Sequence, residues 1–153
     1  MRRDYFGVSF TNLDDETSEP QQPTLSISYT GPREKFSGWL NQADGTPLAA
    51  ADVDVSFRLK RPIEADDSKG VLAVTNRTNG EFILEVNLKT RDVLRFIRVA
   101  RRYGNLADDE KHYTLHLDGP AGDVAFEKAT FLVYSHTGEL LHQHSLIPSG
   151  VEL

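Results

Sequence analysis

Residues 90–104, TRDVLRFIRVARRYG, are the stretch on which the expected fold depends. Apolar residues recur in it at intervals of three and four, which is the spacing of one face of an α-helix. We therefore predict a helix over residues 90–103. Thr90 is placed to cap the first turn of this helix, and Gly104 is placed to end it with a positive φ.

The two sides of this helix differ in chemistry. At about 100° per residue, apolar side chains gather on one side and arginines on the other. The apolar side requires a partner surface, because burying each large side chain stabilises the fold by roughly 1.5–3 kcal/mol. The apolar side comprises Val93, Phe96, Ile97, Val99, Ala100 and Tyr103, and the basic side comprises Arg91, Arg95, Arg98 and Arg102.

Most of the remaining chain predicts β-strands, because apolar and polar residues alternate along it. The alternation is plainest in residues 52–59, DVDVSFRL. In residues 139–146 it places His142 and His144 on one face of a strand. The expected strands cover residues 3–10, 24–30, 52–59, 71–77, 81–88, 113–117, 123–134 and 139–146.

Two hairpins are expected among these strands. Asn79-Gly80 separates two of them and is the strongest short signal for a hairpin turn. Residues 135–138, SHTG, separate the last two strands. In the arm that follows Gly80, alternation predicts a single core-facing set, made of Phe82, Leu84, Val86 and Leu88.

The fold class follows from how these elements are connected. Short polar connections, rather than regularly alternating helices, argue against a parallel βαβ sheet. We predict an α+β fold, in which a mainly antiparallel, curved sheet of about seven or eight strands packs on the helix at 90–103. A short helix is expected near 32–40. The length suits a single domain, 1–153, with a mobile acidic loop at 13–23 and an extended tail at 147–153.

Composition excludes several classes of function. The chain has 153 residues and no cysteine, which excludes disulfides, thiolate metal sites and cysteine nucleophiles. A net charge of −6 argues against general affinity for nucleic acid or acidic membranes. No apolar run is long enough to span a membrane, and the N-terminus lacks the apolar core of a signal peptide. We expect a soluble, cytoplasmic protein.

The histidines are the best candidates for chemistry. The sequence contains no P-loop, GxGxxG after a strand, GxSxG or HExxH motif, so we assign no catalytic residue and no cofactor. His142 and His144 form one pair, and His112 and His116, four residues apart, form another. Imidazole pairs can bind zinc or a similar metal, but polar residues on the exposed face of a sheet have the same spacing. We expect no bound metal.

The basic side of the helix is the second candidate. Its four arginines suit an acidic protein partner or a phosphate backbone, and the alternative is a solvated face that the chain's own acidic loops neutralise. Phe96 and Tyr103 point to the core, so the basic side offers no aromatic surface for base stacking. This argues against nucleic acid. The sequence carries no signal for oligomeric state, partner identity or a small-molecule ligand.

Nearly the whole chain, from Arg2 to Leu153, resembles a family of small uncharacterised proteins from haloarchaea. The resemblance implies no activity and no site residue, because the role of that family is unknown. The segments that carry it are MRRDYF, DVDVSFRL, GVLAVTNRTNGEFILEV, FIRVARRYG and FLVYSHTGELLHQHSLIPSGVEL.

Taken together, these patterns favour a non-enzymatic interaction or structural module over an enzyme. The alternative is a metal-binding or metal-dependent protein that uses the histidine pairs. A second alternative is a nucleic-acid-binding protein that uses the arginine side of the helix.

Overall fold

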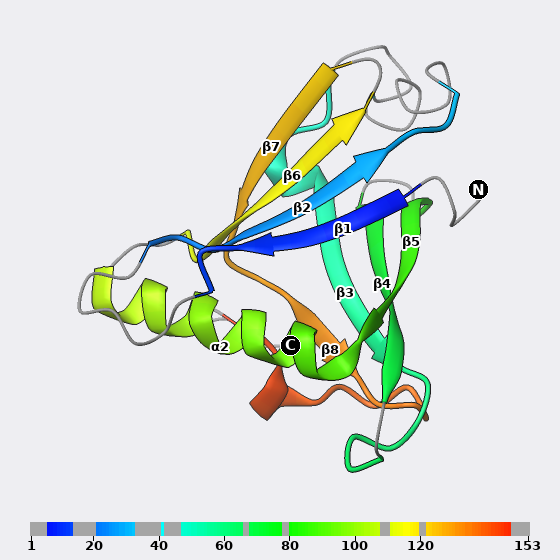
Figure 1. The fold of residues 1–153 in the computed structure, drawn as a ribbon, viewed down its shortest axis with the longest axis vertical. Coiled ribbons are helices and arrows are strands. Elements are labelled where there is room, and N and C mark those ends of the chain that lie inside the picture. The colour runs from blue at the N-terminus through cyan, green and yellow to red at the C-terminus, as the bar shows by residue number, and fades with distance from the viewer. Residues whose placement is uncertain are drawn as a thin grey trace.

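The chain folds into two β-sheets and a long helix (Figure 1). The computed structural model describes residues 6–13, 21–32, 41, 47–65, 68–77, 80–107, 111–119 and 122–147. The elements within these ranges are β1 (Phe6–Thr11), β2 (Thr24–Tyr29), η2 (Ala50–Asp52), β3 (Val53–Leu59), β4 (Lys69–Asn76), β5 (Phe82–Lys89), α2 (Thr90–Ala107), β6 (Tyr113–Gly119), β7 (Gly122–Lys128), β8 (Leu132–Tyr134) and η3 (His142–His144).

Each sheet has four strands, in the orders β1-β2-β6-β7 and β5-β4-β3-β8. The pairs β2–β6 and β3–β8 are parallel, and the other neighbouring strands are antiparallel. The predicted α+β class and the mainly antiparallel pairing are confirmed. The predicted strand count and curvature agree roughly with the structure, but the prediction of a single sheet is wrong, because the strands form two.

The predicted strand at 123–134 explains this difference. It divides into β7, which pairs with β6 in the first sheet, and β8, which pairs with β3 in the second. Residues 129–131 carry the chain from one sheet to the other. The alternation changes phase along this stretch, since the buried side chains are Phe126 in β7 and then Phe131 and Val133, an odd number of residues later.

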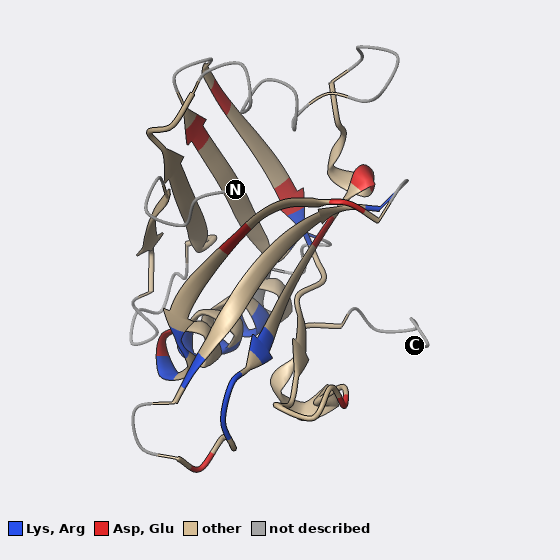
Figure 2. Cartoon of the chain, turned by 90° about the vertical axis from the view of Figure 1, so that its right-hand side faces the viewer, with Lys and Arg blue, Asp and Glu red and all other residues tan. Residues whose placement is uncertain are grey.

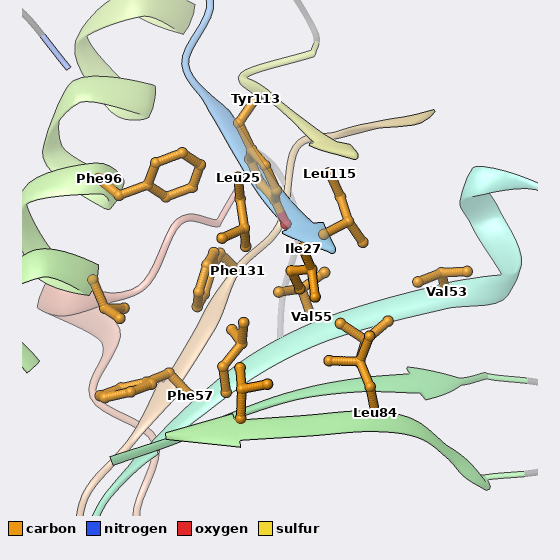
Figure 3. Close-up of a cluster of buried hydrophobic side chains, with 14 of the residues drawn as sticks. Leu25, Ile27, Val53, Val55, Phe57, Leu84, Phe96, Tyr113, Leu115 and Phe131 are labelled. Carbon is orange, nitrogen blue, oxygen red and sulfur yellow. The ribbon is translucent and has the colours of Figure 1, made fainter. Parts of the chain in front are cut away.

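Both sheets and the helix contribute to one hydrophobic core (Figure 3). Along most of the strands, alternation places every second side chain in it, as predicted. In β3, for example, Val53 and Phe57 are completely buried, whereas Asp54 and Arg58 are exposed. The core members that Figure 3 labels are Leu25, Ile27, Val53, Val55, Phe57, Leu84, Phe96, Tyr113, Leu115 and Phe131.

Phe96 joins α2 to this core. Its side chain is completely buried. Its ring centroid lies 5.2 Å from that of Phe10, 5.4 Å from that of Tyr113 and 6.1 Å from that of Phe131. These three rings come from β1, β6 and the segment just before β8. Phe96 therefore packs against core side chains from both sheets. The predicted apolar side of the helix is therefore confirmed.

The helix begins at Thr90, as predicted, directly after the last residue of β5. The Thr90 hydroxyl makes its hydrogen bond with a side chain rather than with a backbone amide of the helix. Its oxygen lies 3.0 Å from the hydroxyl oxygen of Ser68. The Thr90 amide donates to the carbonyl of the same serine, at 2.9 Å. These two contacts attach the start of α2 to the residue that precedes β4.

The predicted end of the helix at Gly104 is wrong. Helix α2 continues to Ala107, and Gly104 is a buried residue inside it, without the positive φ that was expected. A side chain at this position would collide with the imidazole ring of His112. Gly104 is therefore a packing glycine, which lets His112 lie against the last turns of the helix.

Gly104→Ala is expected to lower the free energy of unfolding by about 1–3 kcal/mol, the usual range for an overpacked core. In an unobstructed helix the same change would instead stabilise by about 1 kcal/mol. Urea denaturation of the wild type, Gly104→Ala, His112→Ala and the double variant tests this. Gly104→Ala should become neutral or stabilising once His112 is alanine, and equal losses in both backgrounds would contradict contact with His112 as the cause.

The β4–β5 hairpin forms where Asn79-Gly80 predicts it, and Gly80 has a φ of 74°. The predicted core face of β5 is only partly correct. The register of the hairpin shifts between Val74 and Thr75, so that Ile83 and Leu84 are both buried. The resulting β-bulge turns Phe82 outward, where 57% of its surface is exposed.

The predicted strand at 139–146 is also wrong. A turn at 135–138 is present, and Gly138 has a φ of 91°. The returning chain makes only isolated bridges, Tyr134 with Leu140 and Phe131 with Leu146. Between these bridges it forms η3. Its pairing is interrupted because the Ser145 hydroxyl takes the place of a backbone group and accepts the amide proton of Val133, at 2.9 Å.

Three further predictions fall wholly or partly outside the described residues. They are most of the short helix near 32–40, residues 14–20 of the acidic loop, and residues 148–153 of the tail. Within the described part of the chain, the structure has no helix that is both long and apolar enough to cross a membrane.

Candidate functional site

The basic side of α2 lies away from the core, as the sequence predicts. Arg91, Arg95 and Arg98 are exposed, and Arg102 is half-buried. Helical geometry places them on one side because they are separated by three or four residues. We call these four residues, together with Arg101 and Asn105, the basic face of α2.

Arg95 and Arg101, two members of the basic face, donate hydrogen bonds to other segments of the chain. The Arg95 guanidinium donates to the backbone carbonyl of Leu13, at 3.2 Å. Arg101 donates to the carbonyl of Ser145 at 2.7 Å, and a second carbonyl, that of Gln143, lies at 3.5 Å. Arg101 therefore joins the helix to the segment that follows η3, and its guanidinium is held in place before any ligand arrives.

Arg91 and Arg98 have weaker attachments. The Arg91 Nε atom lies 4.0 Å from a carboxylate oxygen of Asp92, and both side chains are largely exposed. Such a pair contributes little to stability. Arg98 has no hydrogen-bond or ion-pair partner among the described residues. It is the member of the basic face that is most available to a binding partner.

A shallow hollow of about 360 Å³ lies on the basic face, lined by Arg98, Arg101, Arg102 and Asn105. Sequence reasoning missed two of these residues. Arg101 lies off the predicted stripe, and Asn105 lies beyond the predicted end of the helix. Extending the helical period through Gly104 would have found Asn105. The hydrogen bond between Arg101 and the Ser145 carbonyl, in contrast, has no signal in the sequence.

Charge is unevenly distributed over the molecule (Figure 2). Blue segments gather on and around α2, and most of the red segments lie on the strands above it. Overall the chain carries a net charge of −6. The basic face is thus a local feature of an acidic protein, and it would attract an acidic surface without giving the whole molecule general affinity for polyanions.

The histidine pairs do not have the geometry that the sequence suggested. His142 and His144 lie in the short η3 turn, so the prediction that a strand puts them on one face is wrong. His116 is in β6, while His112 precedes that strand and packs against Gly104 of the helix. The described residues include no group of three or more His, Asp or Glu side chains arranged to hold a metal ion.

His116 belongs to a different polar cluster, at the β6–β7 hairpin. Its Nε2 atom lies 3.5 Å from a carboxylate oxygen of Asp123. Asp123 is the cross-strand neighbour of Asp118. A hydrogen bond between the two carboxyl groups and the negative charge of Asp123 raise the pKa of Asp118, with a smaller opposing effect from His116. Asp118 therefore keeps its proton to a higher pH than an isolated aspartate would.

Asp118→Asn is expected to raise the melting temperature near neutral pH. A raised pKa in the folded state means that the stabilisation by the shared proton is present at low pH and is lost as pH rises through that pKa. The amide keeps a hydrogen-bond donor and removes the repulsion. Melting curves from pH 3 to 8 should show the variant's advantage growing with pH. Glu127→Gln, an exposed change on β7, is the control, and equal gains for both variants would contradict the pairing.

The architecture places the molecule in a broad structural class. The molecule is an α+β protein, with two open four-stranded sheets and one long helix among its described residues. The chain belongs to a family of unknown function (DUF5793), whose model matches residues 1–153. No match is found among the curated proteins or among the solved structures.

Proposed function

We propose that this protein is a non-enzymatic binding module, which presents the basic face of α2 to an acidic segment of a partner protein. The observation that supports this most directly is the hollow at Arg98, Arg101 and Arg102. Three guanidinium groups and the Asn105 amide surround it. All of them can donate hydrogen bonds, and guanidinium groups bind carboxylates in a bidentate geometry.

The fold has no evident need for charges at Arg91 and Arg98, which are exposed. Any good helix former would serve at these exposed positions. Arginines spaced by three or four residues repel each other by a few tenths of a kcal/mol per pair. An acidic partner would offset this repulsion. The contact from Arg101 to the Ser145 carbonyl supports the proposal further, because a guanidinium that is already ordered loses less entropy on binding.

The chain's own acidic segment is the competing occupant. Arg95 contacts the carbonyl of Leu13, and Asp14, Asp15 and Glu16 follow directly in the sequence. If these acids neutralise the basic face, its arginines serve stability within the chain. The two possibilities predict opposite results when the charges on the basic face are reversed.

The test is the double variant Arg95→Glu with Arg98→Glu. We expect it to fold with an unchanged melting temperature and to bind a labelled Asp/Glu-repeat peptide at least tenfold more weakly, a loss of about 1.4 kcal/mol. Fluorescence anisotropy measures the binding. The matched control, Lys60→Glu with Arg61→Glu, makes the same change in net charge at exposed residues outside the helix.

Three outcomes would contradict the proposal. Equal weakening by the control pair would show that only net charge matters. Early melting of the test variant, made worse at low salt, would show that the arginines pair within the chain. Tight binding of a DNA or RNA oligonucleotide in place of the acidic peptide, with a steep salt dependence, would assign the basic face to nucleic acid.

The resemblance to haloarchaeal proteins adds a condition to this proposal. In a cytoplasm of near-molar salt the Debye length is about 3 Å, so long-range attraction to the basic face would be almost absent. Recognition would then depend on direct contacts that exclude water. The binding assays should accordingly be repeated at high salt, where the hydrogen bonds at the hollow, rather than net charge, would dominate.

A further inference from the structure

A second cavity lies where β5 passes into α2, separate from the hollow at Arg98. Its volume is about 440 Å³, which is within the size range of small-molecule sites. One wall is apolar and is formed by Ile63, Ala65 and Leu94. The rest of its lining, which we call the cationic wall, is cationic and hydroxylic. We call this cavity the β5–α2 cleft.

Two lysines of the cationic wall lie at positions where their like charges repel each other. Lys69, at the start of β4, is directly opposite Lys89, at the end of β5, in the antiparallel register. Both line the cleft and both are exposed. Like charges directly opposite each other across two strands are destabilising. Neither lysine side chain has a hydrogen-bond or ion-pair partner among the described residues.

A third cation, Arg91, lines the same wall. Its neighbour Asp92 lies 4.0 Å away and is too exposed to neutralise it strongly. The cleft therefore brings together three positive side chains with one weak counter-charge. An anion that enters the space between Lys69, Lys89 and Arg91 would relieve the repulsion among them.

The hydroxyl groups of Ser68 and Thr90 supply an independent indication of a ligand. Both side chains are more than nine-tenths buried, and their oxygens lie 3.0 Å apart in the wall of the cleft. Each hydroxyl carries one proton, and a single hydrogen bond between them uses only one of the two. The second proton has no acceptor among the described residues. A buried donor of this kind is costly to leave unsatisfied.

We propose that the β5–α2 cleft binds a small amphipathic anion, a carboxylate or phosphate head group that carries an aliphatic chain. Lys69, Lys89 and Arg91 neutralise the head group, and the free hydroxyl proton of the Ser68–Thr90 pair donates to one of its oxygens. The aliphatic chain lies against Ile63, Ala65 and Leu94. This site shares Arg91 with the basic face, but the proposed protein-binding role rests on the hollow at Arg98, Arg101 and Arg102 and is tested at Arg95 and Arg98.

The lining of the cleft selects this class of ligand over others. Among the residues that the structure describes, its lining includes no aromatic side chain on which a nucleobase or another flat ring could stack. Its described lining also includes no carboxylate to bind a cation. Inorganic phosphate alone would leave the apolar wall exposed to water, and a neutral alcohol would leave the three cations unpaired. An anion with an apolar chain satisfies both walls.

The experiment measures the binding of four probes to the full chain by isothermal titration calorimetry. The probes are octanoate, octyl phosphate, inorganic phosphate and 1-octanol. We expect octanoate or octyl phosphate, or both, to bind at least tenfold more tightly than phosphate or octanol. The tighter of the two identifies the head group. The proposal is overturned if neither amphipathic anion binds, or if octanol binds as tightly as they do.

Variants locate the site. Lys69→Met with Lys89→Met should weaken binding of the amphipathic anion at least tenfold while the melting temperature stays the same or rises, because the repulsion is removed. Lys60→Met with Arg61→Met removes the same charge outside the cleft and should leave binding unchanged. Unchanged binding in the Lys69 and Lys89 variant overturns the proposal. So does its earlier melting at low salt, since the lysines would then be neutralised by acids of the chain, such as Asp66 and Asp67 beside Ser68.

Discussion

Phe96→Ala is expected to lower the free energy of unfolding by about 3–5 kcal/mol, the range for a buried phenylalanine. The side chain is completely buried. Its ring packs on Phe10, Tyr113 and Phe131, which approach from three different segments. Collapse around the cavity would require all three to move together. Relaxation of the side chains around the cavity should therefore recover little of the lost free energy of unfolding.

Arg98→Ala is the matched control for this variant, because it removes a large side chain from the opposite side of the same helix. Arg98 is exposed and has no partner among the described residues, so its loss should stay within about 0.5 kcal/mol. Urea denaturation gives both values. Similar losses for the two variants would contradict the assigned orientation of α2.

Lys128→Met is expected to cost about 1.5–3 kcal/mol, the usual value of hydrogen bonds to a charged group. The Lys128 ammonium donates to the carbonyl of Ala50 at 2.7 Å and to that of Val53 at 2.5 Å. Lys128 ends β7 in the first sheet, whereas Val53 begins β3 in the second. A single half-buried side chain thus links the two sheets, and methionine keeps its stem but none of its donors.

The dependence of this effect on pH tests the same contact. Burial lowers the pKa of Lys128, with a smaller opposing effect from Asp54. The unfolded chain therefore binds more protons than the folded chain between the lowered and the ordinary lysine pKa, so the contribution of Lys128 rises with pH across that window. The neutral amine still has two protons for the two carbonyls. Lys60→Met, an exposed control, should change neither the stability nor this slope, and equal losses would contradict the link.

The elements themselves were largely predictable from periodicity. The helix at 90–103 and the strands around Ile27, Phe57 and Leu115 each bury one face, and burial imposes the period that the sequence shows. Periodicity carries no information about which strands become neighbours. The division of 123–134 between two sheets depends on pairing with β6 and β3, which lie far apart in the sequence.

Two of the wrong predictions, at Gly104 and Phe82, have causes of the same kind. Gly104 matched a helix end, but the imidazole of His112, from beyond the helix, fills the space beside it. Phe82 matched the alternation of β5, but the bulge that turns it outward arises in the pairing with β4. In both cases a residue distant in sequence changes the outcome of a local rule.

The two candidate sites also differ in whether the sequence predicts them. The arginines of the basic face were found from the helical period alone. The β5–α2 cleft was not found, because Lys69 and Lys89 are twenty residues apart and only the hairpin register places them side by side. A register built outward from Asn79-Gly80 would have been uncertain, since the bulge near Val74 shifts it by one residue.

That bulge also bears on how the protein behaves at high concentration. Strand β5 is an edge of its sheet, and an exposed edge strand offers unpaired backbone groups to strands of other molecules. A bulge bends the strand and increases its twist, which spoils the straight template that such pairing needs. Without the bulge, an unbroken edge would be open to fibril-like assembly. The irregular register thus gives β5 resistance to aggregation, even with Phe82 on its surface.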